Sequence, residues 1–200
     1  DDLDDLISYS YPYLLDCEKI SDCIEKIKAL LDYLPDNNLS ASPFGGENDD
    51  INRTSEVLNS ADTENLDIRT VINEISDASS VLELSKDFAP NVATALVKLG
   101  GESAAVVAAS GELDIAGCKK ASRFVRFADS FNIPVVTITN VTGFKADKNE
   151  EDANSLASAA ELISAYAEAT TAKIDIIAGS ACGGAYLALG SKYIGSDMTI

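Results

Sequence analysis

Apolar segments of strand length alternate with amphipathic helical segments from Asp67 onward, and this alternation constrains the fold more than any other feature. The continuous apolar runs Ile133–Ile138 and Lys173–Ala178 are typical of strands buried on both faces. Helical patterns at Cys118–Phe131 and at 151–170 precede them. A repeated order of helix and buried strand predicts an α/β core with mostly parallel strands and right-handed crossovers.

The same region begins with a short helix and a hairpin. Asp67–Ile75 has the pattern of a helix, and Asn91–Leu99 and Ser103–Ala109 read as strands joined by a tight turn at Gly100 and Gly101. In the later helices we expect buried stripes, which comprise Ala121, Phe124, Val125, Ala128 and Phe131 in the first and Leu156, Ala160, Ile163 and Ala167 in the second.

The first third of the chain is different. Residues 1–66 carry 16 acids and 4 bases, whereas residues 67–200 carry 17 and 11. Apolar residues at helical spacing predict one helix that starts at a Ser21–Asp22 cap and ends near Leu34; they are Ile20, Ile24, Ile27, Leu30, Leu31 and Leu34. Residues 37–66 are rich in Asn, Ser, Asp and Gly and predict a linker.

Composition excludes several classes of function. The chain has 200 residues, 46% of them hydrophobic, which is enough for a sizeable core. It contains no histidine, so triads and metal sites that need imidazole are excluded. A net charge of -18 disfavours nucleic acid as a partner.

Other patterns indicate the compartment. The four cysteines (Cys17, Cys23, Cys118 and Cys182) form no CxxC pair, which favours reduced thiols in the cytoplasm. The longest apolar run, Ile176–Leu189, is too short for a membrane span and is interrupted by glycines. The acidic first residues do not fit a signal peptide, and we expect the chain to be a fragment of a longer protein.

The most informative local feature is Ile174–Gly190, an apolar strand that passes through a turn of small residues into a helix. Gly183 and Gly184 lack a Cβ, so a ligand oxygen could approach the first helical N–H groups, those of Gly184 and Ala185. Such donors form an oxyanion hole without any side chain, each typically worth roughly 3 to 4 kcal/mol in the transition state. The alternative is that the glycines only allow close packing.

Three nearby patterns favour ordinary structural roles. The run Gly179–Gly183 resembles a GxSxG elbow, but Ala181 occupies its centre and no histidine exists to activate Ser180 or Cys182. The basic residues Lys119, Lys120, Arg123 and Arg126 fit a solvated helix face better than a phosphate site. The acids Asp114, Asp147, Glu150 and Glu151 have no metal-ligand spacing and fit turns and helix N-termini.

Eight stretches of the chain form a recognisable series; they are Asp67–Ile72, Leu82–Asn91, Leu99–Gly101, Ala121–Val135, Thr142–Phe144, Ala165–Thr170, Cys182–Tyr186 and Gly190–Lys192. Similar stretches occur in the same order in the carboxyltransferase subunits of biotin-dependent acyl-CoA carboxylases and decarboxylases, which the chain therefore resembles. By this resemblance, residues 1–38 are the tail of an N-terminal carboxyltransferase domain, residues 39–66 an acidic linker and residues 67–200 the first part of the C-terminal domain.

The resemblance implies a crotonase-like superhelix of ββα units, incomplete in this chain, with an active site shared between subunits. In the family a carboxyl group moves between N1′ of a carrier-borne biotin and the α-carbon of an acyl-CoA, without a metal. The backbone amides of Gly184 and Ala185 would form the oxyanion hole for the biotin ureido oxygen. Gly143, Phe144, Gly183 and Tyr186 would line the biotin pocket, although Thr142 stands where the family usually has proline. Leu187 occupies the position associated with acyl-chain selectivity.

The implied partners are an acyl-CoA, a biotin carboxyl carrier protein and further copies of the chain, with the subunits of a membrane decarboxylase as additional candidates. The acyl group, the direction of transfer and the oligomeric state stay open. Two alternatives also stay open, namely a crotonase-type enoyl-CoA hydratase or isomerase and a non-catalytic assembly domain. The isolated chain is expected to be inactive.

Overall fold

The structure is a computed structural model that describes residues 20–46, 49–50, 52–62, 66–148 and 155–200. A six-stranded sheet in the order β1-β2-β3-β4-β5-β6 forms its centre. The strands are β1 (Leu82–Leu84), β2 (Val92–Leu99), β3 (Glu102–Leu113), β4 (Val135–Phe144), β5 (Lys173–Ala181) and β6 (Met198–Thr199). The first three pair antiparallel, and β3 to β6 are parallel. The predicted α/β core with a hairpin and parallel strands is thus confirmed.

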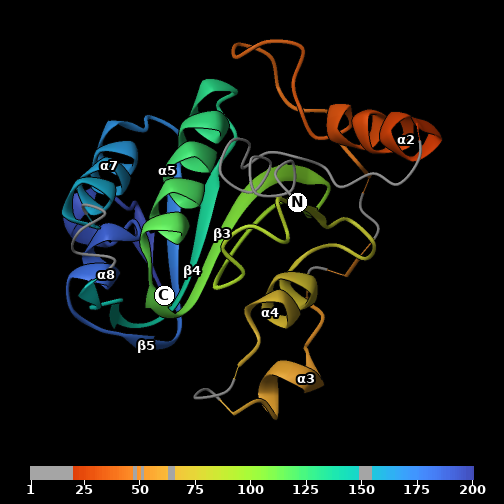
Figure 1. Cartoon of the computed structure of the whole chain (residues 1–200). Coiled ribbons are helices and arrows are strands. Elements are labelled where there is room, and N and C mark those ends of the chain that lie inside the picture. The colour runs from red at the N-terminus through yellow and green to blue at the C-terminus, as the bar shows by residue number, and fades with distance from the viewer. Residues whose placement is uncertain (1–19, 47–48, 51, 63–65, 149–154) are drawn as a thin grey trace.

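Helices cover both faces of this sheet. They are α2 (Ile20–Leu31), α3 (Glu56–Asn59), α4 (Ile68–Ile75), α5 (Ile115–Ser130), α7 (Ser155–Glu168), α8 (Gly183–Ala188) and the 3-10 helix η1 (Lys192–Ile194). Figure 1 shows α5, α7 and α8 together on one side of the sheet, with α4 on the other. Alternation along β3 explains the two layers, because Val107 packs toward Phe124 of α5 and Val106 toward Ile72 of α4.

The glycine turn predicted between the hairpin strands lies between β2 and β3. The hairpin register runs from Val92 opposite Ala109 to Leu99 opposite Glu102. Gly100 and Gly101 have φ of 59° and 82°, a backbone region that favours glycine. Asp77 accepts hydrogen bonds from both of their amides, at 2.9 and 2.7 Å.

Two predicted helices differ from expectation in detail. Helix α5 starts at Ile115, before the predicted Cys118, because the Asp114 carboxylate caps it by accepting from the Gly117 amide at 2.7 Å. The predicted face of α7 is wrong: its buried residues include Leu162 and Tyr166, whereas Leu156 is 79% exposed. Apolar residues lie all around this alanine-rich helix, and the Tyr166 hydroxyl reaches Thr137 at 2.9 Å, which orients it.

The first third packs against the core more closely than a free linker would. Helix α2 ends at Leu31, close to the expected end, but Ser21 and Asp22 lie inside the helix and do not cap it. The Tyr33 hydroxyl donates to the Ser80 carbonyl at 2.7 Å, and the Lys98 ammonium donates to the Pro43 carbonyl. The short helix α3 also lies within the predicted linker.

None of the helices in the described ranges has both the length and the apolar character needed to cross a membrane.

Candidate functional site

The glycine turn that the sequence singled out lies at the carboxyl end of β5, where the chain enters α8. Gly183 has φ of 62°, and a Cβ at this residue would meet nothing within 4 Å. Cys182 occupies the N-cap position in an extended conformation, but its side chain makes no capping hydrogen bond. The first amides of α8 therefore lack the side-chain acceptor that most helix starts provide.

The two predicted donor residues differ in accessibility. Gly184 is exposed, whereas Ala185 is 0% exposed. A ligand oxygen can approach the Gly184 amide directly, and it can reach the Ala185 amide only if the turn opens. The partial positive charge at the start of a helix adds to the attraction for a negative oxygen.

The segment that ends β4 lies against this turn. The Phe144 ring is half-buried, and its Cε2 atom lies 3.2 Å from the position that a Cβ of Gly184 would occupy. The Cys182 amide also donates to the Val141 carbonyl at 3.1 Å. Gly143 has φ of 153° and no atom within 4 Å of its Cβ position. The structure thus brings two predicted site residues, Phe144 and Gly184, into contact. Gly143 directly precedes Phe144 in the sequence.

The remaining predicted residues lie on α8. Tyr186 is half-buried, and Leu187 is 42% exposed and is not a member of the core cluster that includes Ala185. Burial raises the pKa of the Tyr186 phenol, and the neighbouring Asp175 carboxylate raises it further. At neutral pH this phenol is therefore protonated and can donate a hydrogen bond.

Asp175, a fully buried acid on β5, was not among the predicted site residues. Burial raises the pKa of its carboxyl, while the Thr139 hydroxyl, which donates to Oδ1 at 3.2 Å, and the Tyr186 phenol lower it. Asp175 Oδ2 has no partner with hydrogen-bond geometry, so Tyr186 acts on the carboxylate as a nearby dipole. An aspartate between the apolar residues Ile174 and Ile176 was the available signal in the sequence.

The structure also tests the three nearby patterns, and in the GxSxG-like run Ser180 and Cys182 are both exposed. Lys120 is wrongly predicted as solvated: it is 1% exposed, and its ammonium donates to the carbonyls of Ser85 and Phe88 at 2.8 and 2.6 Å. Burial lowers the pKa of Lys120 to about 8. Arg126 pairs with Glu168 at 2.7 Å on the surface.

Of the predicted acids, Asp114 caps α5 as expected for a helix N-terminus, and Asp147 pairs with Lys145 at 3.4 Å. Glu150 and Glu151 lie outside the described residues.

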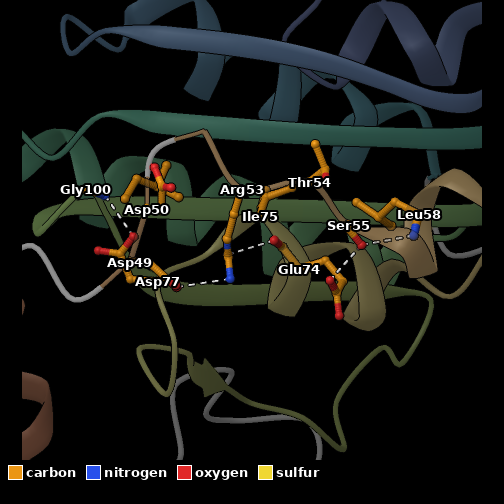
Figure 2. Close-up of a pocket in the computed structure, with 11 residues that line it drawn as sticks. Asp49, Asp50, Arg53, Thr54, Ser55, Leu58, Glu74, Ile75, Asp77 and Gly100 are labelled. Carbon is orange, nitrogen blue, oxygen red and sulfur yellow. Dashed lines mark hydrogen bonds and ion pairs between the residues drawn. The ribbon is translucent and has the colours of Figure 1, made fainter.

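A separate pocket of about 520 Å³ lies at the other end of the sheet, near the turn before β3 (Figure 2). Arg53 crosses it, pairing with Asp49 at 3.0 Å and donating to the carbonyls of Glu74 and Ser76. The Ser55 hydroxyl donates to the Glu74 carboxylate at 2.7 Å. These polar groups bind one another, and the hydrogen bonds of Arg53 and Ser55 to Glu74 connect the first third of the chain to α4.

Comparison with known proteins now gives the family. A family model described as the carboxyl transferase domain matches residues 15–200. The chain belongs to the carboxyl transferase family. It is 39% identical over 196 residues to the propionyl-CoA carboxylase beta chain of Saccharopolyspora erythraea, a match that covers 90% of this chain and 36% of that protein. It is 38% identical to the methylmalonyl-CoA decarboxylase subunit alpha of Veillonella parvula, covering 90% and 37%.

Solved structures agree with this family. The transcarboxylase 12S structure with hydrolysed methylmalonyl-coenzyme A superposes with a TM-score of 0.87 at 35% identity, covering 92% of this chain and 38% of that one. The beta subunit of geranyl-CoA carboxylase from P. aeruginosa shares the fold, with a TM-score of 0.70 at 20% identity. The predicted crotonase-like fold is confirmed. The carboxyltransferase chain spans little more than a third of the length of these curated relatives.

Proposed function

We propose that this chain is part of a biotin-dependent acyl-CoA carboxyltransferase, which moves a carboxyl group between N1′ of biotin and the α-carbon of an acyl-CoA. The family match supports the reaction class. The observation that carries the site is the exposed, uncapped turn at Gly184 beside Phe144. Phe144 ends strand β4 and Gly184 lies in the first turn of helix α8, and the fold brings the two residues into contact.

The residues fit a biotin ring. Gly184 presents no Cβ, so a planar ureido group could lie against its amide, and the half-buried Phe144 ring offers an apolar wall. Carboxybiotin, when bound, supplies the carboxyl group that is transferred. The amide of Gly184 would donate to the ureido oxygen, on which negative charge increases as the carboxyl group leaves. The amide of Ala185 would join it as the second donor once the turn opens.

The other residues have supporting roles in this proposal. Gly143 and Gly183 keep the approach to the amide free of side chains, because neither has a Cβ. Tyr186, held protonated, would also line the biotin pocket. Leu187 would contact the acyl chain and favour a small aliphatic group, a selectivity that one side chain can alter by roughly tenfold.

The implied partners follow from the relatives. The transcarboxylase 12S structures are described as a hexamer assembly, one of them with methylmalonyl-coenzyme A bound, and we propose a homo-oligomer and an acyl-CoA substrate for the protein that contains this chain. A biotin carboxyl carrier protein would deliver the cofactor, and membrane decarboxylase subunits are further candidate partners. Cys23 and Cys182 form no disulfide among the described residues, which supports a cytoplasmic location.

The test is carboxyl exchange in the full-length protein that contains this chain. We expect it to exchange labelled carboxyl between acyl-CoA and biotin and to show no hydration of enoyl-CoA. Hydration without exchange would replace the proposal by a crotonase-type hydratase. Binding of a biotinylated carrier with neither activity would leave a non-catalytic assembly domain.

The 200-residue chain provides a second measurement. We expect no transfer to free biotin from this chain alone, because it spans little more than a third of the length of its relatives and because we propose that the site is shared between subunits. Transfer by the chain alone would contradict the shared site.

A further inference from the structure

The β5 strand bulges immediately before the glycine turn. Thr139 pairs with Ile177 and Val141 pairs with Ala181, so Asn140 on β4 stands opposite three residues of β5, namely 178–180. Two extra residues on one strand interrupt the backbone ladder. Such bulges commonly occur beside active sites, where they redirect the following chain.

The Asn140 side chain replaces the missing ladder contact. Its Oδ1 atom accepts a hydrogen bond from the Ser180 amide at 2.8 Å, and the residue is 8% exposed. The bond gives the Ser180 amide a protein acceptor at the point where the backbone ladder is interrupted. The carboxamide therefore fixes the bulge in one conformation.

Three contacts then join the two segments in order. Asn140 bonds Ser180, the Val141 carbonyl accepts from Cys182, and the Phe144 ring lies against Gly184. Residues 140–144 and 180–184 thus face each other as a pair, and Asn140 forms the first contact along both. A shift at Ser180 would also shift Gly184, since only three residues lie between them.

We propose that Asn140 is a positioning residue of the transfer site, whose carboxamide oxygen holds the β5 bulge so that the Gly184 amide faces the ligand beside Phe144. The proposal rests on the proposed function for its catalytic consequence, whereas the clamp itself is a property of the fold. Asn140 would act through the β5 bulge and would not contact the ligand. A misplacement of about 1 Å at a reacting group can lower a rate on the order of 10²-fold.

The experiment compares three variants of the full-length protein. Asn140→Leu keeps the size of the side chain and removes the acceptor, whereas Asn140→Asp keeps an oxygen acceptor. Ser180→Ala is the matched control, because it changes the side chain and retains the amide. The readouts are hydrogen exchange of the backbone amides at 180–184, KM for acyl-CoA, and kcat of carboxyl transfer.

We expect Asn140→Leu to lose protection at Ser180 and to lower kcat on the order of 10²-fold with little change in KM for acyl-CoA. Asn140→Asp should restore both protection and most of the rate, and Ser180→Ala should resemble the wild type. A merely structural residue would lower the amount of folded protein and leave kcat per folded molecule unchanged.

Two results would overturn the proposal. Retained protection at Ser180 in Asn140→Leu would show that the carboxamide does not hold the bulge. Lost protection with an unchanged kcat would show that the bulge does not position the site. If Asn140→Leu does not fold, the wild-type protein still gives a test, because rapid exchange of the Ser180 amide would contradict the clamp. Absence of transfer in the wild type would refute the proposed function and leave the exchange result intact.

Discussion

The Gly-Gly turns at Gly100–Gly101 and Gly183–Gly184 begin with the same left-handed conformation and have different surroundings. Gly100 and Gly183 have φ of 59° and 62°, and a Cβ at either residue would meet nothing within 4 Å. Both turns follow a strand. In the first, Asp77 binds the amides of both glycines, whereas in the second the Cys182 side chain binds no amide of α8.

A Gly-Gly pair in the sequence therefore does not by itself predict a binding site. What distinguishes a turn that only folds from one that can bind an oxygen is whether the protein supplies its own acceptor. In the hairpin the carboxylate of Asp77 already neutralises the donors, so no ligand is needed. At α8 the exposed Gly184 has no such side-chain acceptor at its amide, and the proposed function assigns the biotin ureido oxygen to this donor.

The largest effect is expected at Gly184. Gly184→Val would place side-chain carbons against the Phe144 ring, where even a Cβ lies 3.2 Å from Cε2, and would cover the amide. Removal of one donor of an oxyanion hole typically lowers a rate 10²- to 10³-fold. We expect a loss of roughly this size in kcat for carboxyl transfer by the full-length protein, with folding intact by circular dichroism. An unchanged kcat would show that the Gly184 amide takes no part in transfer, so that the α8 turn would be structural like the hairpin turn.

The next effect is expected at Asp77 and concerns stability alone. Asp77→Ala would leave the buried Gly101 amide without an acceptor and expose the Gly100 amide to water. We expect the free energy of unfolding to fall by about 2 kcal/mol, with kcat per folded molecule unchanged. Asp77→Asn, which retains one oxygen acceptor, should lose about half as much. Denaturant titration measures both, and a fall in kcat as large as that of Gly184→Val would contradict separate roles.

A third substitution would give the α8 turn a carboxylate acceptor, as Asp77 does for the hairpin turn. Cys182→Asp would place a carboxylate at the N-cap of α8, where it can accept from the amides of Gly184 or Ala185. The free energy of unfolding should rise by about 1 kcal/mol, while transfer should fall roughly tenfold because a ligand must displace the new cap. Cys182→Ala, which offers no acceptor, is the control. Equal transfer by the two variants would show that the α8 amides do not take part.

Local patterns predicted much of this fold because each depends on neighbours in the sequence. The hairpin around Gly100, the strand that begins β4 and the α5 stripe at Phe124 all follow from periodicity and turn residues. The glycine turn at α8 was also found in this way, whereas only the family resemblance assigned Phe144 to the same site.

The residues that were missed depend on distant partners. Lys120 bonds Ser85, 35 positions away, and Asn140 bonds Ser180, 40 positions away. No periodicity encodes such pairs, since packing in three dimensions brings them together. The α7 face was missed for a related reason: alanine on several faces leaves the choice to Tyr166 and its bond to Thr137.

The last pair of substitutions compares the two turns directly, by placing alanine at the first glycine of each. Gly100→Ala and Gly183→Ala each force alanine into a left-handed conformation, at a cost of about 1 to 2 kcal/mol, and neither Cβ meets a neighbour. We expect nearly equal losses in the free energy of unfolding of the full-length protein, measured by denaturant titration. Only Gly183→Ala should also lower kcat for transfer, because its methyl group lies on the approach to the Gly184 amide. Equal kcat values would show that the space in front of Gly183 is not used by the ligand, which would confine the site to Gly184 and the Phe144 side of the turn.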